Sequence, residues 1–328
     1  PYQMNEFVVR LGSEIQDSPV FGGSWLVWRE GTSDRTPGEY KRVRGRNLAN
    51  GQSLDLGVID ILLWPPDIDN GMLVAFERSP QRIVSVLPSL TETVCALGQC
   101  QRLVGVDRYS NFPDSVRQLP QVGGGIDPNI EAIVALKPDV VLMATSARGA
   151  ERLRALGIKV LALEPKSHAD VRRVLDTVGQ LLAVDDAQRV WRVIDASVSA
   201  AAQSLPARAR AARVYFEVNT GPYAAGESSF IGETLVRLGV RNIVPAALGP
   251  FPKLNPEFVV RANPDVIMVG DRNFAGMETR PGWASMQAIR HARVCVFKPE
   301  QADMLVRPGP RMAEGARIMA QCLSDKLG

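Results

Sequence analysis

The chain is poor in the residues that build metal and catalytic sites. Its only histidines are His168 and His291, and neither has a second plausible ligand nearby in the sequence, which argues against a protein zinc site. The sequence contains no GxSxG, no GxxxxGK[ST] and no GxGxxG after a strand, and neither histidine is spaced from a cysteine or serine like a catalytic pair. We therefore expect no catalytic residue, no metal site and no resident cofactor.

Neither a dominant charge nor a long apolar run is present. The 38 Lys+Arg and 35 Asp+Glu leave a net charge of +3, which gives no reason to expect nucleic acid or an anionic membrane as a partner. The best apolar run, residues 56–64, is interrupted by Asp60 and falls short of the roughly 18 to 20 residues of a membrane helix. With 45% apolar residues, a chain of 328 residues can bury two sizeable cores.

The cysteines are few and form no CxxC motif. Cys95 and Cys100 flank the end of an expected helix and could form a bridge if the chain turns back there. Cys295 lies in an apolar, strand-like run, and Cys322 lies in the last expected helix. We expect these four side chains to be small buried residues rather than a disulfide framework, because free cysteine is commonly buried.

Two pairs of segments repeat along the chain. Residues 129–141 read Asn-x-Glu, a short apolar helix, Pro-Asp and an apolar strand, and residues 255–267 read the same. Residues 92–98, Glu-Thr-Val-Cys-Ala-Leu-Gly, return as Glu-Thr-Leu-Val-Arg-Leu-Gly at 233–239. The order of the repeats is the same in both halves, which predicts two related lobes.

The chain divides into four segments. Residues 1–79 form an N-terminal extension of unknown role, with short strands expected at 7–9, 25–28 and 58–64. Strands and helices alternate over 80–166 and again over 207–328, which is typical of parallel βαβ units. Helical periodicity covers the connector at 167–206. The predicted fold is α/β, with two pseudo-symmetric, Rossmann-like lobes joined by a single long helical connection.

The expected helices begin at recognisable caps. Ser89 to Glu92 reads as a capping box for a helix that ends at Gly98. Ser167 and Asp170 are expected to cap the connector, and a second helix is expected to start after Asp185-Asp186.

Each repeated Asn-x-Glu segment places a glutamate in the first turn of a helix. Helical phasing puts Glu131 opposite an apolar face formed by Ile130, Ile133, Val134 and Leu136, and it puts Glu257 opposite Val259, so both carboxylates should be exposed. A glutamate in the first turn favours the positive end of a helix by about 0.3 to 1 kcal/mol, which is one explanation. The other is a symmetric pair of acidic groups that binds basic residues of a partner with its own two-fold symmetry.

The segments around these residues resemble a known family. The run Arg82-Ile83-Val84-Ser85, the segment Tyr109-Ser110-Asn111-Phe112-Pro113 and the stretch from Asn129 to Asp139 are similar to the helical-backbone (class III) substrate-binding proteins of ABC transporters, especially the vitamin B12-binding members. The resemblance runs from about Arg82 to the C-terminus. It implies a periplasmic, monomeric protein that holds its ligand in a cleft between the lobes and docks on the transporter permease.

The resemblance assigns roles to residues. Glu131 and Glu257 match the glutamates that dock on the transporter, one per lobe. Tyr109 matches a ring that lies against the corrin, and Tyr223 and Phe251 match aromatic positions of the pocket in the second lobe. Asp303 and Arg307 match a polar pair that faces the amide groups of the ligand, although residues four apart could equally form a surface ion pair.

Three positions depart from the pattern of the family. Gly125 and Ala144 stand where the B12-binding members have tryptophans, which removes an aromatic wall while the glycine loop could let a ligand approach the backbone. Cys322 matches a disulfide position of the family, but its expected partner position holds Leu238.

The sequence thus predicts a receptor that binds a cobalt corrinoid and performs no chemistry on it. A haem- or siderophore-binding protein of the same class is the alternative. A chelatase-like enzyme is a remote alternative, because a chelatase would need a histidine and a carboxylate converging in the cleft.

Overall fold

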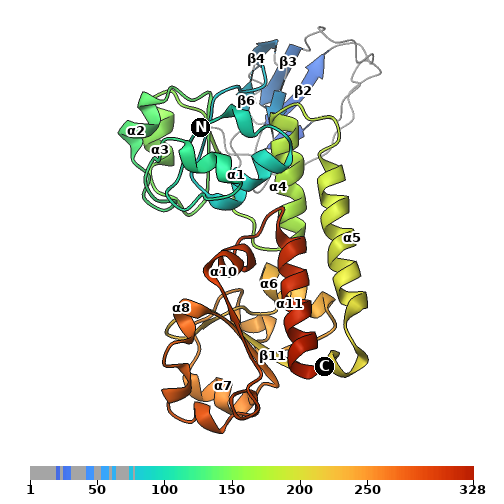
Figure 1. Ribbon diagram of the computed structural model, residues 1–328. Helices are drawn as coiled ribbons and strands as arrows, with labels where there is room; N and C mark the ends of the chain where they lie inside the picture. Colours follow the sequence, from blue (N-terminus) through green and yellow to red (C-terminus); the bar gives the residue numbers. More distant parts are fainter. Residues whose placement is uncertain are drawn as a thin grey trace. The chain divides into compact units, whose positions relative to one another are not determined.

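The computed structural model describes residues 20–22, 25–30, 42–47, 53–58, 61–63, 74–76 and 78–328. The chain divides into two compact units, the first formed by residues 1–164 and 174–187 and the second by residues 165–173 and 188–328 (Figure 1). Within the described part, no helix combines the length and apolar content that crossing a membrane requires.

The N-terminal segment contributes two antiparallel sheets. The first has the order β1-β2-β3-β4 and the second pairs β5 with β6. The strands are Val20–Gly22, Trp25–Glu30, Arg42–Asn47, Ser53–Val58, Ile61–Leu63 and Val74–Phe76. The expected strand at 25–28 is part of β2, and the one expected at 58–64 is covered in part by β4 and β5. The strand expected at 7–9 lies outside the described residues.

A parallel sheet forms the centre of the first unit. Its order is β10-β9-β7-β8, so the chain begins in the middle, adds β8 on one side and then β9 and β10 on the other. The strands are Ile83–Ser85 (β7), Leu103–Val106 (β8), Val140–Met143 (β9) and Val160–Ala162 (β10). The helices between them are Pro88–Ala96 (α1), Ile130–Ala135 (α2) and Ala150–Ala155 (α3). Ile133 and Leu153 of two of these helices pack against Val84, Val141 and Val160 of the sheet.

The second unit repeats this topology. Its first strand, β11, is parallel to β13 along one edge and to β14 along the other, and β15 follows β14. The strands are Arg213–Asn219 (β11), Tyr223–Ala224 (β12), Arg241–Asn242 (β13), Val266–Gly270 (β14) and Val294–Phe297 (β15). The helices are Phe230–Arg237 (α6), Pro256–Ala262 (α7), Asp271–Phe274 (α8), Gln287–Arg290 (α9), Pro299–Leu305 (α10) and Met312–Leu327 (α11). The predicted α/β class with two Rossmann-like lobes is confirmed.

The repeated Pro-Asp motif has the same structural role in both units. The Asp139 carboxylate accepts hydrogen bonds from the backbone N–H groups of Gln81 (2.7 Å) and Arg82 (2.9 Å) just before β7. The Asp265 carboxylate accepts one from the backbone N–H of Arg213, at 2.8 Å, where β11 starts. Each aspartate therefore fixes the first strand of its sheet against the neighbouring strand, which explains the repeat in the sequence.

The connector at 167–206 consists of two helices, which agrees with the second start expected after Asp185-Asp186 and not with a single long helix. They are His168–Leu181 (α4) and Gln188–Ser204 (α5), and the helical path breaks at Ala183, which has a φ of +53°. The predicted cap of α4 is confirmed, because Ser167 Oγ accepts from the Asp170 N–H while the Asp170 carboxylate accepts from the Ser167 N–H. Helix α5 runs beside α11 in the second unit (Figure 1).

The capping box predicted at Ser89 is wrong. Helix α1 begins one residue earlier, with Pro88 in its first turn and Leu87 as the N-cap, and no side chain caps it. Proline favours this first position because its missing N–H would have no partner there. The predicted end at Gly98 is correct, and this residue has the left-handed φ of +77° that favours glycine.

The expectation that the cysteines are unpaired is also wrong. Cys95 bridges Cys100, because the chain reverses at Gly98 and brings the two Cα atoms within 4.1 Å. Cys322, on the face of α11 that covers the sheet, bridges Cys295 of β15, with Cα atoms 6.1 Å apart. The second bridge joins elements that are distant in the sequence, so spacing alone could not identify it.

Candidate functional site

Tyr109 stands on a tightly held loop at the carboxyl edge of the first sheet. Its side chain is 59% exposed, while Asp107 directly after β8 is completely buried. The Asp107 carboxylate accepts hydrogen bonds from the Tyr109 N–H and from Ser110 Oγ. Ser110 Oγ also lies 2.8 Å from Thr91 Oγ1, which donates to Ser85 Oγ. This buried network fixes the backbone of the loop and presents the tyrosine ring to solvent.

Two apolar side chains that the sequence analysis did not select are exposed in the loops after β8. Phe112 is 40% exposed and Ile126 is 67% exposed. Phe112 belongs to the same Tyr-Ser-x-x-Pro segment as Tyr109, which is the signal that could have identified it. Ile126 lies in no such motif. A single apolar residue in a loop does not reveal its exposure, so the sequence could not have identified it. Ligands of open α/β sheets bind at the carboxyl ends of the strands, where both residues lie.

Gly125 and Ala144, which stand where the family has tryptophans, place no large side chain in this part of the first unit. A Cβ on Gly125 would lie 2.9 Å from the carbonyl oxygen of Val86, so the close approach of the backbone to the end of β7 requires glycine. Ala144, directly after β9, is 6% exposed. Among these residues, the aromatic surface of the first unit is therefore provided by Tyr109 and Phe112.

In the second unit, Tyr223 and Phe251 lie on paired segments. The Ala224 N–H donates to the carbonyl of Pro252 and the Gly226 N–H donates to that of Pro250, so β12 lies beside residues 250–253. Tyr223 and Phe251 are each 39% exposed. The Phe251 ring meets Phe230 edge-on, with centroids 6.3 Å apart. The structure thus places these two predicted pocket residues on neighbouring segments.

Asp303 and Arg307 form the ion pair that their spacing suggested. The Arg307 guanidinium donates to Asp303 Oδ2 over 2.9 Å, and the Asp303 side chain is 43% exposed while that of Arg307 is 10% exposed. The pair lies on and just after α10, the helix that follows the carboxyl end of β15. Contact with a ligand stays a prediction for both residues.

Glu131 and Glu257 are exposed, as their helical phase predicted. Each lies in the first turn of a helix whose N-cap is an asparagine side chain, Asn129 for α2 and Asn255 for α7. Glu131 forms an ion pair with Arg152 over 2.8 Å. Glu257 forms no ion pair with the residues that the structure describes. The docking role of both glutamates stays a prediction.

The predicted apolar face of α2 is wrong in one position. Val134 is 39% exposed, because this helix has only six residues and buries mainly Ile130 and Ile133 against the sheet.

A buried polar network under β12 was missed by the sequence analysis. The Glu217 side chain is completely buried and accepts two hydrogen bonds from the Arg280 guanidinium, at 2.7 and 2.9 Å, and one from the Tyr215 hydroxyl. The Arg280 guanidinium also lies 4.5 Å from the centroid of Trp283. Glu217 raises the pKa of Arg280, and burial raises the pKa of Tyr215. Sequence spacing could not reveal this network, because Arg280 is 63 residues from Glu217.

The network lies where β11 changes its pairing. Glu217 pairs with Ala224 and Asn219 pairs with Tyr223, with a β-bulge between them. Bulges turn side chains out of the regular alternation of a strand. The Glu217–Arg280 pair therefore supports the backbone that presents Tyr223.

His168 is buried at the start of α4 within the second unit. Thr234 Oγ1 donates to the carbonyl of Phe230, so the His168 Nε2–H must be the donor to Thr234 Oγ1, 2.8 Å away. Nδ1 then faces the guanidinium of Arg237 at 3.3 Å. Burial, together with the positive charge of Arg237, lowers the pKa of His168 from 6.5 to about 4. Its surroundings thus favour the neutral ring.

We expect this histidine to make the protein less stable in acid. Its pKa is depressed in the folded state, so the unfolded chain binds more protons between about pH 4 and 6.5, and stability falls as the pH drops through this window. The loss from pH 7 to pH 4.5 is about 2 to 3 kcal/mol. Urea unfolding at several pH values should show that His168→Gln removes this part of the pH dependence. His291→Gln, which changes an exposed histidine, is the control. Equal pH dependence in wild type and His168→Gln would contradict the assignment.

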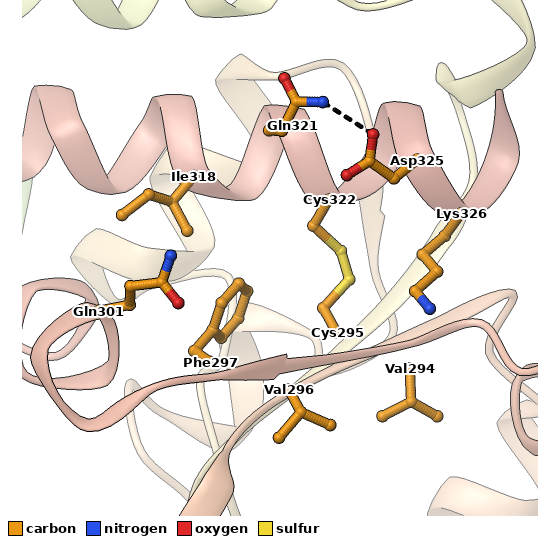
Figure 2. Close-up of a pocket in the computed structure, with 10 residues that line it drawn as sticks. All are labelled: Val294, Cys295, Val296, Phe297, Gln301, Ile318, Gln321, Cys322, Asp325 and Lys326. Carbon is orange, nitrogen blue, oxygen red and sulfur yellow. Dashed lines mark hydrogen bonds between the residues drawn. A yellow bond between two sulfur atoms is a disulfide. The ribbon is translucent and has the colours of Figure 1, made fainter.

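A separate pocket lies between β15 and α11 (Figure 2). It has a volume of about 470 Å³, and the Cys295–Cys322 disulfide forms part of its wall. Gln321 donates to Asp325 at its rim, at 2.7 Å. None of the seven predicted site residues lines it. No group of three or more His, Cys, Asp or Glu among the described residues could hold a metal ion.

The matches to known proteins cover most of the chain. A family described as "Periplasmic binding protein" matches residues 83–301. An uncharacterized ABC transporter substrate-binding lipoprotein of Bacillus subtilis is 29% identical over 80% of this chain and 86% of its own length. A cobalamin-binding protein of Halobacterium salinarum is 31% identical over 62% of this chain and 58% of its own length. A periplasmic heme-binding protein solved with two hemes is 28% identical, with a TM-score of 0.66, and the match covers 75% of this chain and 99% of that one.

Proposed function

Because the chain belongs to the periplasmic binding protein family, we propose that it captures a corrinoid, a vitamin B12-like cobalt macrocycle, and delivers it to an ABC importer. The observation that carries this proposal is the exposed ring of Tyr109 on its buried hydrogen-bond network. A ring held in place loses little conformational entropy when a flat macrocycle packs on it. The similarity to a cobalamin-binding protein supports the choice of ligand.

Membership of the same family supports the other roles that we propose. The protein acts as a carrier and performs no chemistry on its ligand. Glu131 and Glu257 dock on the permease, and Asp303 and Arg307 face the amide groups of the corrin edge. A periplasmic location agrees with two disulfides, because such bridges persist in oxidising compartments.

Haem is the second candidate ligand. The heme-binding structure with 28% identity favours it. The phenolate of a tyrosine can ligate haem iron, whereas a corrin would contact only the face of the tyrosine ring. Tyr109 therefore distinguishes the two ligands.

We expect Tyr109→Ala to weaken the binding of cyanocobalamin about tenfold, because it removes the stacked ring. Tyr109→Phe keeps the ring and should leave the affinity nearly unchanged. Quenching of the protein's intrinsic fluorescence by cyanocobalamin measures the affinity of both variants. We expect a sub-micromolar midpoint for the wild type. If Tyr109→Phe instead abolishes saturable binding of haem, and cyanocobalamin does not bind the wild type, haem is the ligand.

A further inference from the structure

Strand β15 is an open edge of the second sheet. Among the described strands, β15 pairs only with β14, and the two are parallel. The Ile267 N–H of β14 donates to the carbonyl of Arg293 over 3.1 Å. Alternate residues of a parallel strand face its neighbour, so Val294 and Val296 direct their backbone N–H and carbonyl groups away from β14. Within the described part of the chain, no backbone hydrogen bond uses these outward groups.

The pocket beside α11 follows this open edge. Cys295 and Phe297 face α11, and Val294 and Val296 lie on the opposite face of the strand (Figure 2). All four residues line the pocket, so it reaches around the edge of β15. Its volume of about 470 Å³ falls within the range of about 300 to 1,000 Å³ that is typical of ligand sites. The unpaired backbone groups of the strand therefore border a cavity of useful size.

The floor of the pocket is apolar and covalently braced. The Cys295–Cys322 disulfide joins β15 to α11, and Ile318 lies one helical turn before Cys322. Cys295 and Phe297 are 5% and 4% exposed, whereas Val296 on the other face is 41% exposed. A strand that added to β15 would place every second side chain over this floor, because side chains alternate along a strand.

One end of the pocket carries a positive charge. Lys326 reaches from α11 toward the start of β15, and its ammonium donates to the carbonyl of Ala292 over 3.0 Å. An ammonium has three N–H groups, so two are left for another acceptor. Lys326 forms no ion pair with the residues that the structure describes, and the neighbouring Asp325 accepts from Gln321 on the helix (Figure 2). A ligand carboxylate is therefore suited to this end.

We propose that β15 and α11 bind an extended peptide segment that ends in a free carboxylate. The peptide runs antiparallel to β15, bonds to the outward backbone groups of Val294 and Val296, and brings its C-terminus to Lys326. Alternate side chains pack on the disulfide floor. The site lies wholly within the second unit and does not depend on the identity of the ligand proposed above.

A second copy of the chain fits this edge less well. Antiparallel pairing of two β15 strands would bring the Lys298 that follows one strand beside the Lys326 at the start of the other. Like charges placed opposite each other destabilise a strand pair. The C-terminal carboxylate of a peptide provides the opposite charge at the same place.

The first test varies the charge at the C-terminus of a probe peptide. The probe is Ser-Thr-Val-Thr-Val with fluorescein on its N-terminus, made once with a free C-terminal carboxylate and once with a C-terminal amide. We expect the acid to bind the wild type with a dissociation constant below about 1 mM, and the amide to bind about tenfold more weakly. Lys326→Gln should weaken the acid to the level of the amide and leave the amide unchanged. Fluorescence anisotropy measures the four affinities.

The second test removes a backbone donor from the edge. Val296→Pro deletes an N–H that points away from β14, so the ladder between β14 and β15 is kept. It should weaken both peptides by at least about fivefold. Val296→Thr retains the N–H and is the matched control, with the affinities of the wild type. Circular dichroism verifies the fold, and the Lys326→Gln comparison decides alone if Val296→Pro does not fold.

Three results would overturn the proposal. They are the absence of saturable peptide binding, equal affinity of the wild type for the acid and the amide, and equal affinity of Val296→Pro and Val296→Thr for the acid. Sedimentation velocity examines the other occupant. A wild-type dimer that Val296→Pro dissociates would assign the edge to a second copy of the chain and overturn the peptide site.

Discussion

Replacing both Glu131 and Glu257 by alanine should abolish uptake of the ligand and leave its affinity for the protein unchanged. The two carboxylates occupy equivalent first-turn positions in α2 and α7, on exposed surfaces. Charged pairs buried at an interface cost about 2 to 5 kcal/mol each when one partner is truncated. Loss of two such contacts lowers the affinity for the permease by about 1,000-fold or more. Uptake of labelled cyanocobalamin by the reconstituted importer measures the effect.

The free protein should not be destabilised by this change. The Glu131–Arg152 pair is exposed on both sides, and such surface pairs contribute at most about 1 kcal/mol. The matched control is Glu151→Ala/Glu278→Ala, which removes one exposed first-turn glutamate from each unit and should transport normally. Weaker ligand binding by the Glu131/Glu257 variant, with transport proportional to that loss, would show that the glutamates belong to the ligand site instead.

Arg280→Met should lower the free energy of unfolding by about 3 to 5 kcal/mol, because it leaves the Glu217 carboxylate buried without a cation. The Glu217 side chain is completely buried, and Arg280 provides two of its three hydrogen bonds. The variant should also weaken ligand binding, since the β-bulge beside Glu217 positions Tyr223. Urea unfolding and ligand titration of the same preparation test the two effects.

The control for this prediction is an exposed ion pair. Arg117→Met removes the partner of Asp114, whose side chain is 94% exposed, and should cost no more than about 1 kcal/mol. The double variant Glu217→Gln/Arg280→Met should recover much of the lost stability, because a neutral amide costs less to bury than a carboxylate. A single Arg280→Met variant as stable as Arg117→Met would mean that the buried pair contributes little.

The fold could be predicted because the sequence signals that begin and end its helices and strands are local. Gly98 ends α1, Ser167 and Asp170 cap α4, and the two Pro-Asp motifs mark equivalent strands in the two units. The cap of α1 was misplaced, because Pro88 and Ser89 compete as start signals and the proline begins the helix.

The parts that could not be predicted depend on distant residues. The contacts of Cys295 with Cys322 and of Glu217 with Arg280 depend on how the strands and helices of the second unit pack.

We propose above that this member of the family binds a corrinoid. The most direct measurement is calorimetric titration of the purified protein with cyanocobalamin, dicyanocobinamide and haem under the same conditions. We expect saturable binding of cyanocobalamin at one equivalent with a sub-micromolar dissociation constant. Saturable binding of haem with no heat from either corrinoid would contradict it.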